Sequence, residues 1–235
     1  MNTMYKWICV LFIGAILFSC KKDVYLTSNL SSDQSYFPLK KGFWIEYEVD
    51  SVIHLDLDDR FLMDTSIVTF HFFIREEVDS TFIDATGEQA FSIGRYRRLL
   101  DSLPWSFMSR WTAKLKPAAA ERVEENQRFV KLSFPFNDRK TWNGNAYNSY
   151  EVEDYMYDDL FESSTINTLH FDSTITVVQN DFISNINRIY KIEKYAPRAG
   201  MVYKQLDSLK TILTPTGFLI LNGFEYSLTV KDYQR

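Results

Sequence analysis

The chain has 235 residues and a formal net charge of −5 at pH 7, and 16% of its residues are aromatic. This mild acidity argues against nucleic-acid binding, which usually needs a basic face, and against simple docking on anionic lipid. The 19 Phe and 14 Tyr, beside only 8 Gly and 6 Pro, are typical of a β-protein.

Residues 1–19 have the parts of a secretory signal, with Lys6 near the start, an apolar stretch over 7–18 and Ser19 before Cys20. The apolar stretch is shorter than the roughly 20 residues that cross a bilayer, so we expect a cleaved leader. Its end resembles a lipobox, which predicts that Cys20 is the lipid-attachment site. Acyl chains on Cys20 would hold the protein at a membrane without a span. The alternative is an ordinary secretory leader with an incidental cysteine.

The mature chain is expected to lack disulfides, because Cys9 leaves with the leader and Cys20 is acylated. Removal of residues 1–19 leaves 216 residues, enough for one large β domain. Residues 20–35 are mostly polar and predict a flexible tether behind the lipidated cysteine. Residues 36–235 are predicted to form a single antiparallel β domain.

Period-two alternation of apolar side chains recurs along residues 36–235, as in half-buried strands. Short turn signals separate the alternating segments, so neighbouring strands should be antiparallel. We predict an all-β meander of about eight to ten strands with few short helices, forming a curved sheet or a lipocalin-like barrel; an open curved sheet, a closed barrel and a sandwich remain open. One helix is expected over 153–163. The clearest apolar rows are Phe43, Ile45, Tyr47, Val49; Val68, Phe70, Phe72, Ile74; Val130, Leu132, Phe134, Phe136; Leu169, Phe171, Ile175, Val177; and Phe224, Tyr226, Leu228, Val230.

No motif in the sequence predicts catalysis, a metal or a cofactor. His54, His71 and His170 lie on separate predicted strands, without the close spacing of a helical zinc pair. Residues 90–94 loosely resemble a nucleophile elbow, but the segment continues as a strand, whereas the elbow needs a turn and a helix. Residues 54–59 gather carboxylates that suit calcium, yet they lack the glycine and distal glutamate of an EF-hand, so a solvated hairpin tip is favoured. We therefore predict a non-enzymatic protein without cofactors.

An acidic and aromatic segment over 147–159 is the predicted contact region for a partner or ligand, because aromatic residues are enriched in recognition patches. An acidic loop or a protected edge strand is the alternative. The mature tryptophans, Trp44, Trp105, Trp111 and Trp142, are expected to pack in the core or at a barrel rim. The predicted contact residues are Tyr147, Tyr150, Tyr155, Tyr157, Asp158 and Asp159.

Several motifs spread along the mature chain resemble those of a family of uncharacterised outer-membrane and periplasmic lipoproteins of Bacteroidota. The resemblance implies a lipid-anchored envelope protein and brings no reaction, ligand or active site with it. Gly42 and Gly144, which belong to these motifs, suit turns with positive φ. The motifs are Ser19-Cys20-Lys21-Lys22-Asp23; Tyr36-Phe37-Pro38-Leu39 with Gly42 and Trp44; Val130-Lys131-Leu132-Ser133-Phe134-Pro135; Trp142-Asn143-Gly144-Asn145; and Tyr195-Ala196 leading to Gly200 and Val202-Tyr203-Lys204.

Within that phylum, a lysine after the cysteine followed by acidic residues resembles a signal for export to the outer face of the outer membrane. Here Lys21 and Asp23 fit, whereas Lys22 stands where an acidic residue is often found. The resemblance therefore implies an outer-membrane lipid anchor and leaves both the cell surface and the periplasmic face open.

We expect a non-enzymatic envelope lipoprotein that binds a partner protein or an apolar or glycan ligand. The alternative is a structural accessory subunit of an outer-membrane assembly for secretion, motility or uptake. A third possibility is a polysaccharide or lipid hydrolase, whose pair of carboxylates is chosen by separation in space and not by sequence.

Overall fold

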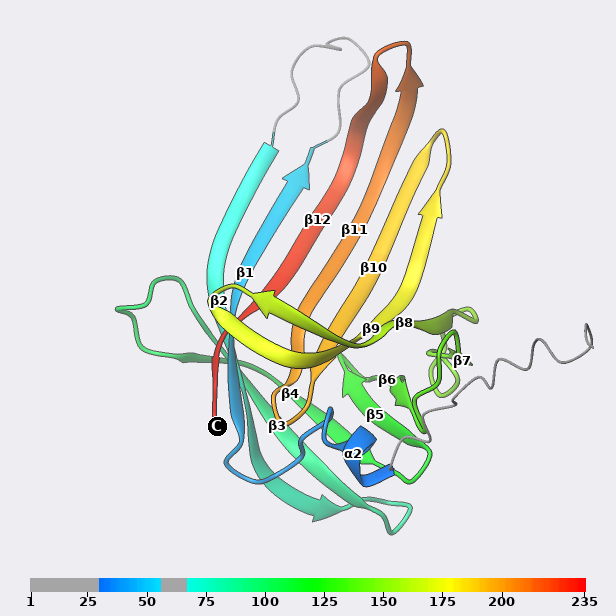
Figure 1. The fold of residues 1–235 in the computed structure, drawn as a ribbon. Coiled ribbons are helices and arrows are strands. Elements are labelled where there is room, and N and C mark those ends of the chain that lie inside the picture. The colour runs from blue at the N-terminus through cyan, green and yellow to red at the C-terminus, as the bar shows by residue number, and fades with distance from the viewer. Residues whose placement is uncertain (1–29, 56–66) are drawn as a thin grey trace, which may run out of the picture.

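A single antiparallel sheet of twelve strands forms the body of the protein, in a computed structural model that describes residues 30–55 and 67–235 (Figure 1). The strand order is β6-β5-β4-β3-β2-β1-β12-β11-β10-β9-β8-β7, so sequence neighbours pair except β6 and β7, which are the two edges, and β1 also pairs with β12. The predicted antiparallel meander is confirmed, with more strands than expected. The elements are α2 (Leu30–Gln34), β1 (Trp44–His54), β2 (Ile67–Ile83), β3 (Gln89–Arg98), β4 (Ser106–Leu115), β5 (Ala119–Glu124), β6 (Gln127–Ser133), β7 (Thr141–Asn143), β8 (Asp154–Ile166), β9 (Leu169–Ile183), β10 (Asn187–Ala196), β11 (Gly200–Thr214) and β12 (Gly217–Tyr233).

The two ends of this sheet meet and nearly close it into a barrel. The Val130 N–H of β6 donates to the Gly144 carbonyl just after β7, at 2.9 Å. The Trp142 indole N–H of β7 donates to the Val130 carbonyl, also at 2.9 Å. Closure therefore rests on individual hydrogen bonds and not on a long ladder.

Most of the apolar rows predicted from alternation line the inside of the sheet, whereas Val68, Phe70 and Phe224 are exposed in the parts of their strands that extend beyond the core. Tyr47 and Val49 of β1 are buried opposite Val230 and Leu228 of β12, which share their face because paired residues of antiparallel strands point the same way. Val177 of β9 is fully buried in the same cluster. The core of the protein is thus the interior of the barrel.

The helix expected over 153–163 is wrong, because this segment belongs to strand β8. Tyr155 and Tyr157 are both buried, which is period-two spacing. The register of β8 against β9 shifts beyond Asp158, and Asp159 and Phe161 have φ of 47° and 65°. This irregularity in the strand produces the apolar spacing that resembles a helical turn.

The chain enters the folded body at α2, which covers one end of the barrel. Asp33 of α2 is 1% exposed, and its carboxylate accepts the Phe136 N–H at 2.9 Å. Tyr36 packs edge-on against Phe136. Residues 30–35 therefore pack on the body although they fall within the segment expected to be a tether. Residues 1–29, with the signal segment and Cys20, lie outside the described residues.

The barrel end beside α2 is filled. Phe37 and Pro38 there line a cavity of about 40 Å³ together with Met201, which leaves room for a few water molecules only.

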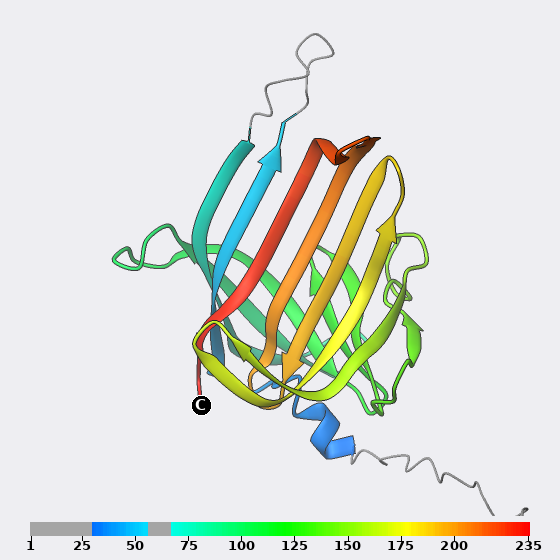
Figure 2. The same cartoon turned by 45° about the horizontal axis from the view of Figure 1, so that its top comes forward.

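At the opposite end, the long strands β1, β2 and β9–β12 rise beyond the shorter strands as a tall wall (Figures 1 and 2). In this wall, residues 67–72 of β2 pair with β1 but have no paired residue in β3. No helix within 30–55 and 67–235 is long and apolar enough to span a membrane.

Candidate functional site

A cleft of about 550 Å³ opens at the unfilled end of the barrel, between the β5–β6 hairpin and strands β9–β11. We call it the mouth cleft. Phe129 and Lys131 of β6 lie on one side, and Lys191 and Lys204 of β10 and β11 lie on the other. The loop between β7 and β8 contributes Tyr150 to its rim. The volume falls within the roughly 300 to 1,000 Å³ typical of small-molecule sites.

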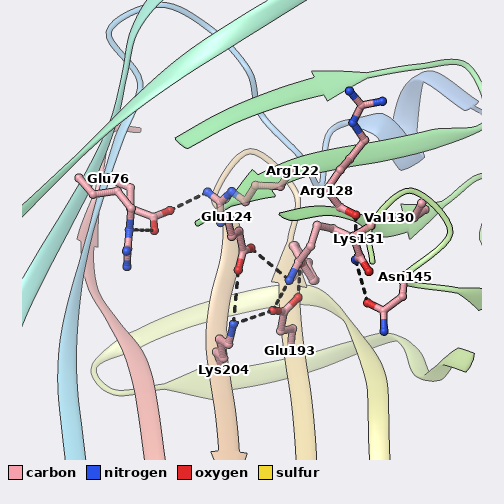
Figure 3. A network of polar contacts seen from close by, with 12 residues as sticks. Glu76, Arg122, Glu124, Arg128, Val130, Lys131, Asn145, Glu193 and Lys204 are labelled. Carbon is pink, nitrogen blue, oxygen red and sulfur yellow. Dashed lines mark hydrogen bonds and ion pairs between the residues drawn. The ribbon is translucent and has the colours of Figure 1, made fainter. Parts of the chain in front are cut away.

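Four charged side chains from four strands form the floor of the mouth cleft (Figure 3). Lys131 Nζ lies 2.5 Å from a Glu193 carboxylate oxygen and 3.3 Å from one of Glu124. Lys204 Nζ lies 3.3 Å from Glu193 and 4.0 Å from Glu124. We call these residues the floor quartet. Lys131 and Glu193 are almost completely buried, so their charges depend on each other for compensation.

Burial and pairing act against each other on the pKa values of the floor quartet. Burial alone would raise the pKa of Glu193, but the charges of Lys131 and Lys204 outweigh it, so the pKa lies well below its usual range. Glu124 behaves in the same way, with its pKa lowered by these two lysines against the effect of burial. Burial would lower the pKa of Lys131, and the two glutamates raise it instead. All three groups are therefore charged at neutral pH.

A second set of charges continues below the floor quartet inside the barrel. Arg122 donates to Glu76 at 2.6 Å and Arg95 Nε donates to Glu76 at 3.0 Å. The Arg95 guanidinium lies 3.6 Å from the centre of the Trp111 ring, a cation–π contact. Tyr195 donates to Glu193 at 2.6 Å, and the charge of Glu124 acts on Arg122 between the two sets. The interior thus holds two neighbouring groups of polar side chains, one at the mouth and one nearer the filled end.

The sequence reading missed the floor quartet, although the alternation that predicted the core also places it. Glu193 pairs in register with Lys204 and with Val177, so all three point into the barrel. Glu76 likewise occupies the next inward position after Ile74, opposite Ile45. Charged residues that continue an apolar row are the signal that could have found these groups.

The rim of the mouth cleft carries one buried polar group without a partner. The Gln179 side chain is 7% exposed, and its amide nitrogen has no hydrogen-bond partner among the residues that the structure describes. Next to it, Glu153 accepts hydrogen bonds from Lys191 at 2.7 Å and Asn180 at 2.9 Å. A buried amide donor left unpaired costs stability, which a ligand acceptor would relieve.

The structure divides the predicted contact residues among different environments. Tyr150 and Tyr155 line the mouth cleft. Tyr157 is fully buried and exchanges hydrogen bonds with the backbone of Ser133, so its role is structural. Tyr147 is exposed outside the cleft. Asp158 faces Arg139 at 3.6 Å and Asp159 is exposed, so residues 147–159 do not form one surface.

The histidines lie apart in separate pairs. His54 contacts Glu225 at 2.7 Å, and His71 contacts Asp50 at 2.8 Å. His170 contacts Thr165 at 3.2 Å. Within residues 30–55 and 67–235, no group of three or more potential ligands gathers at one point. Residues 56–59 of the acidic loop considered for calcium lie outside the described part of the chain.

Trp111, Trp142 and the elbow-like segment over 90–94 are packed against or within the sheet. Trp111 packs on Arg95, and Trp142 packs against Tyr157 with ring centroids 4.5 Å apart. Ser92 is buried within strand β3, so it lies on no exposed turn.

Comparison of the chain with protein-family models gives no match, and no curated protein matches it.

Proposed function

We propose that this protein is a non-enzymatic, lipid-anchored envelope protein that binds a ligand in the mouth cleft. The observation that carries the proposal is the buried Gln179 amide, which lines the cleft without a described partner. Eight buried side-chain atoms of the described residues lack a partner, and Gln179 is the one among them that lines the mouth cleft, where a ligand could complete it. The filled opposite end supports the open mouth as the place of binding.

The charge state of the cleft supports binding over hydrolysis there. A glycoside hydrolase needs one carboxylic acid that stays protonated near neutral pH, which requires a raised pKa. Pairing with lysines lowers the pKa of Glu124 and Glu193 instead. These two carboxylates are therefore hydrogen-bond acceptors and poor general acids.

An accessory subunit of an outer-membrane assembly is the second candidate. The far end of the tall wall exposes apolar side chains on the β9–β10 and β11–β12 hairpins, among them Ile183, Leu213 and Phe218. Contiguous exposed apolar groups often mark protein interfaces. Crosslinking in intact cells separates the two candidates, because a stoichiometric membrane-protein partner at these hairpins favours the assembly.

The lipid anchor is tested by metabolic labelling with an alkyne-tagged fatty acid. We expect the wild-type protein to carry the label and to sediment with membranes. The Cys20→Ala variant should be unlabelled and appear in the soluble fraction, because the acyl chains supply the membrane affinity. A wild-type protein that is unlabelled and soluble would remove the anchor from the proposal.

The ligand site is tested by native mass spectrometry of protein purified gently from envelopes. We expect a bound mass on the wild-type protein that the Gln179→Leu variant loses. The control is Arg110→Ala, which removes an exposed side chain paired with Asp79 outside the cleft. If the bound mass persists in Gln179→Leu, the ligand lies elsewhere.

A further inference from the structure

We infer that the ligand of the mouth cleft is a neutral carbohydrate, held through its hydroxyl groups and packed on the rim aromatics. This inference rests on the proposed function, because it names the class of ligand for the same cleft. Three features of the cleft support it: its paired charges, its preordered hydrogen-bonding groups and its aromatic edge.

The charged groups at the mouth cleft are largely paired with one another. Glu124, Glu151 and Glu153 stand beside Lys131, Lys191 and Lys204 in the lining, and Glu193 lies buried beneath Lys131 and Lys204. The lysines are engaged, since Lys191 pairs with Glu153 and the other two belong to the floor quartet. An anionic or cationic ligand would have to break one of these pairs, whereas a neutral ligand leaves them intact.

Paired charges still offer hydrogen bonds to hydroxyl groups. A carboxylate has about four acceptor positions and an ammonium group three donors, so one partner does not exhaust them. Glu153 receives both described bonds on the same oxygen, Oε1, which leaves Oε2 to accept from a ligand. Gln179 adds a donor that no described residue uses. Donors and acceptors held side by side suit neighbouring hydroxyls, each of which both donates and accepts.

The rim supplies an apolar surface for the C–H face of a sugar ring. Phe129 and Tyr150 lie with ring centroids 6.1 Å apart and planes inclined by 36°. Tyr150 is 57% exposed, so its ring is accessible from the cleft opening. The electron-rich face of an aromatic ring attracts C–H groups, which carry a slight positive charge. A purely apolar ligand would desolvate the Gln179 amide and the second carboxylate oxygen of Glu153 without offering either a partner.

The test is an array of immobilised oligosaccharides that holds neutral gluco-, galacto- and manno-oligosaccharides beside acidic uronate oligomers, probed with the folded chain from residue 21. We expect binding to neutral members, followed by calorimetry with the best of them. Affinity should change less than about twofold between 50 and 500 mM NaCl, because screening acts on charged partners.

Two variants and one matched control identify the contacts. Gln179→Leu and Tyr150→Ala should each weaken binding about tenfold or more, the effect of losing one good contact. Gln179→Leu should also keep or raise the melting temperature of the wild type, because it removes a buried donor that is unpaired without ligand. Tyr147→Ala, which removes an equally exposed tyrosine of the same loop outside the cleft, should bind normally.

The possible outcomes separate this inference from the proposed function. Selective binding of acidic oligomers with steep salt dependence would overturn the neutral class and keep the cleft as the site. Absence of glycan binding, together with a different native ligand that Gln179→Leu loses, would overturn the carbohydrate and keep the proposed function. Absence of any ligand in both experiments would overturn both.

Discussion

Replacing Lys131 by methionine is expected to lower the free energy of unfolding by about 3 to 5 kcal/mol at pH 7, the usual effect of removing one partner from a buried ion pair. Methionine retains much of the length of the side chain but not its charge. Glu193, which is fully buried, would keep only Lys204 at 3.3 Å and the Tyr195 hydroxyl. Urea denaturation followed by tryptophan fluorescence measures the change.

The matched control for this prediction is Arg110→Met. Its ion pair with Asp79 has a similar distance of 2.9 Å, but the Arg110 side chain is 56% exposed. Exposed pairs contribute about 1 kcal/mol or less because water screens them. Equal losses in the two variants would contradict the assignment of the floor quartet as a coupled buried unit.

The ion pairs of the floor quartet should make the free energy of unfolding fall as the pH is lowered. Glu124 and Glu193 have folded-state pKa values below their ordinary range. Their contribution is therefore fully present above the unfolded carboxyl pKa of about 4.3, and it is lost as pH falls from there toward the folded values. In Lys131→Met the two pKa values rise, so the variant should lose less stability than the wild type between about pH 5 and pH 3.

The second large effect is expected from Gly144→Ala. A Cβ atom at this position would lie 2.2 to 2.5 Å from atoms of the Tyr155 ring, which cannot move freely because it is buried. Gly144 also accepts the Val130 N–H that helps close the barrel. Overpacking of this kind typically costs about 1 to 3 kcal/mol, measured as a shift in the urea midpoint at constant slope.

A double-mutant cycle checks the cause. In a Tyr155→Ala background, Gly144→Ala should cost no more than a few tenths of a kcal/mol, about the limit for uncoupled sites, because the clashing ring is gone. Gly94→Ala serves as a control, since its nearest neighbour is the hydroxyl end of the Tyr96 side chain at 2.9 Å, which can shift. An undiminished cost in the Tyr155→Ala background would point to the backbone instead of the ring.

Gly42 and Gly144, the two glycines expected to have positive φ, show which roles of a glycine can be predicted from sequence. Gly42 has φ of +86°, as its turn position predicts. Gly144 has no positive φ, so the prediction for it is wrong, and the reason for glycine is the Tyr155 ring against its α-carbon. A turn conformation depends on local residues, whereas a close approach depends on how β7 and β8 pack.

The same distinction separates the fold, which local patterns predict, from the site, which they do not. Alternation is a local property, so it predicted the antiparallel strands and the buried rows that contain Val49 and Val177. The mouth cleft joins β5 and β6 to β10 and β11, and only the closure of the sheet brings Lys131 and Glu193 together. No local sequence pattern predicts that contact between Lys131 and Glu193. The irregularity at Asp159 misled the helix prediction because period two holds only where strand register is unbroken.

The entry of the chain at α2, opposite the tall wall, has a consequence for orientation. Cys20 lies ten residues before Leu30, a length that reaches about 35 Å at most when fully extended. With lipid on Cys20, the chain would run from the bilayer to the filled end, which carries α2 opposite the tall wall (Figure 2), so the shortest connection places this end toward the membrane. A molecule anchored in this way would turn its sealed base toward the headgroups and leave the mouth cleft accessible from the aqueous side.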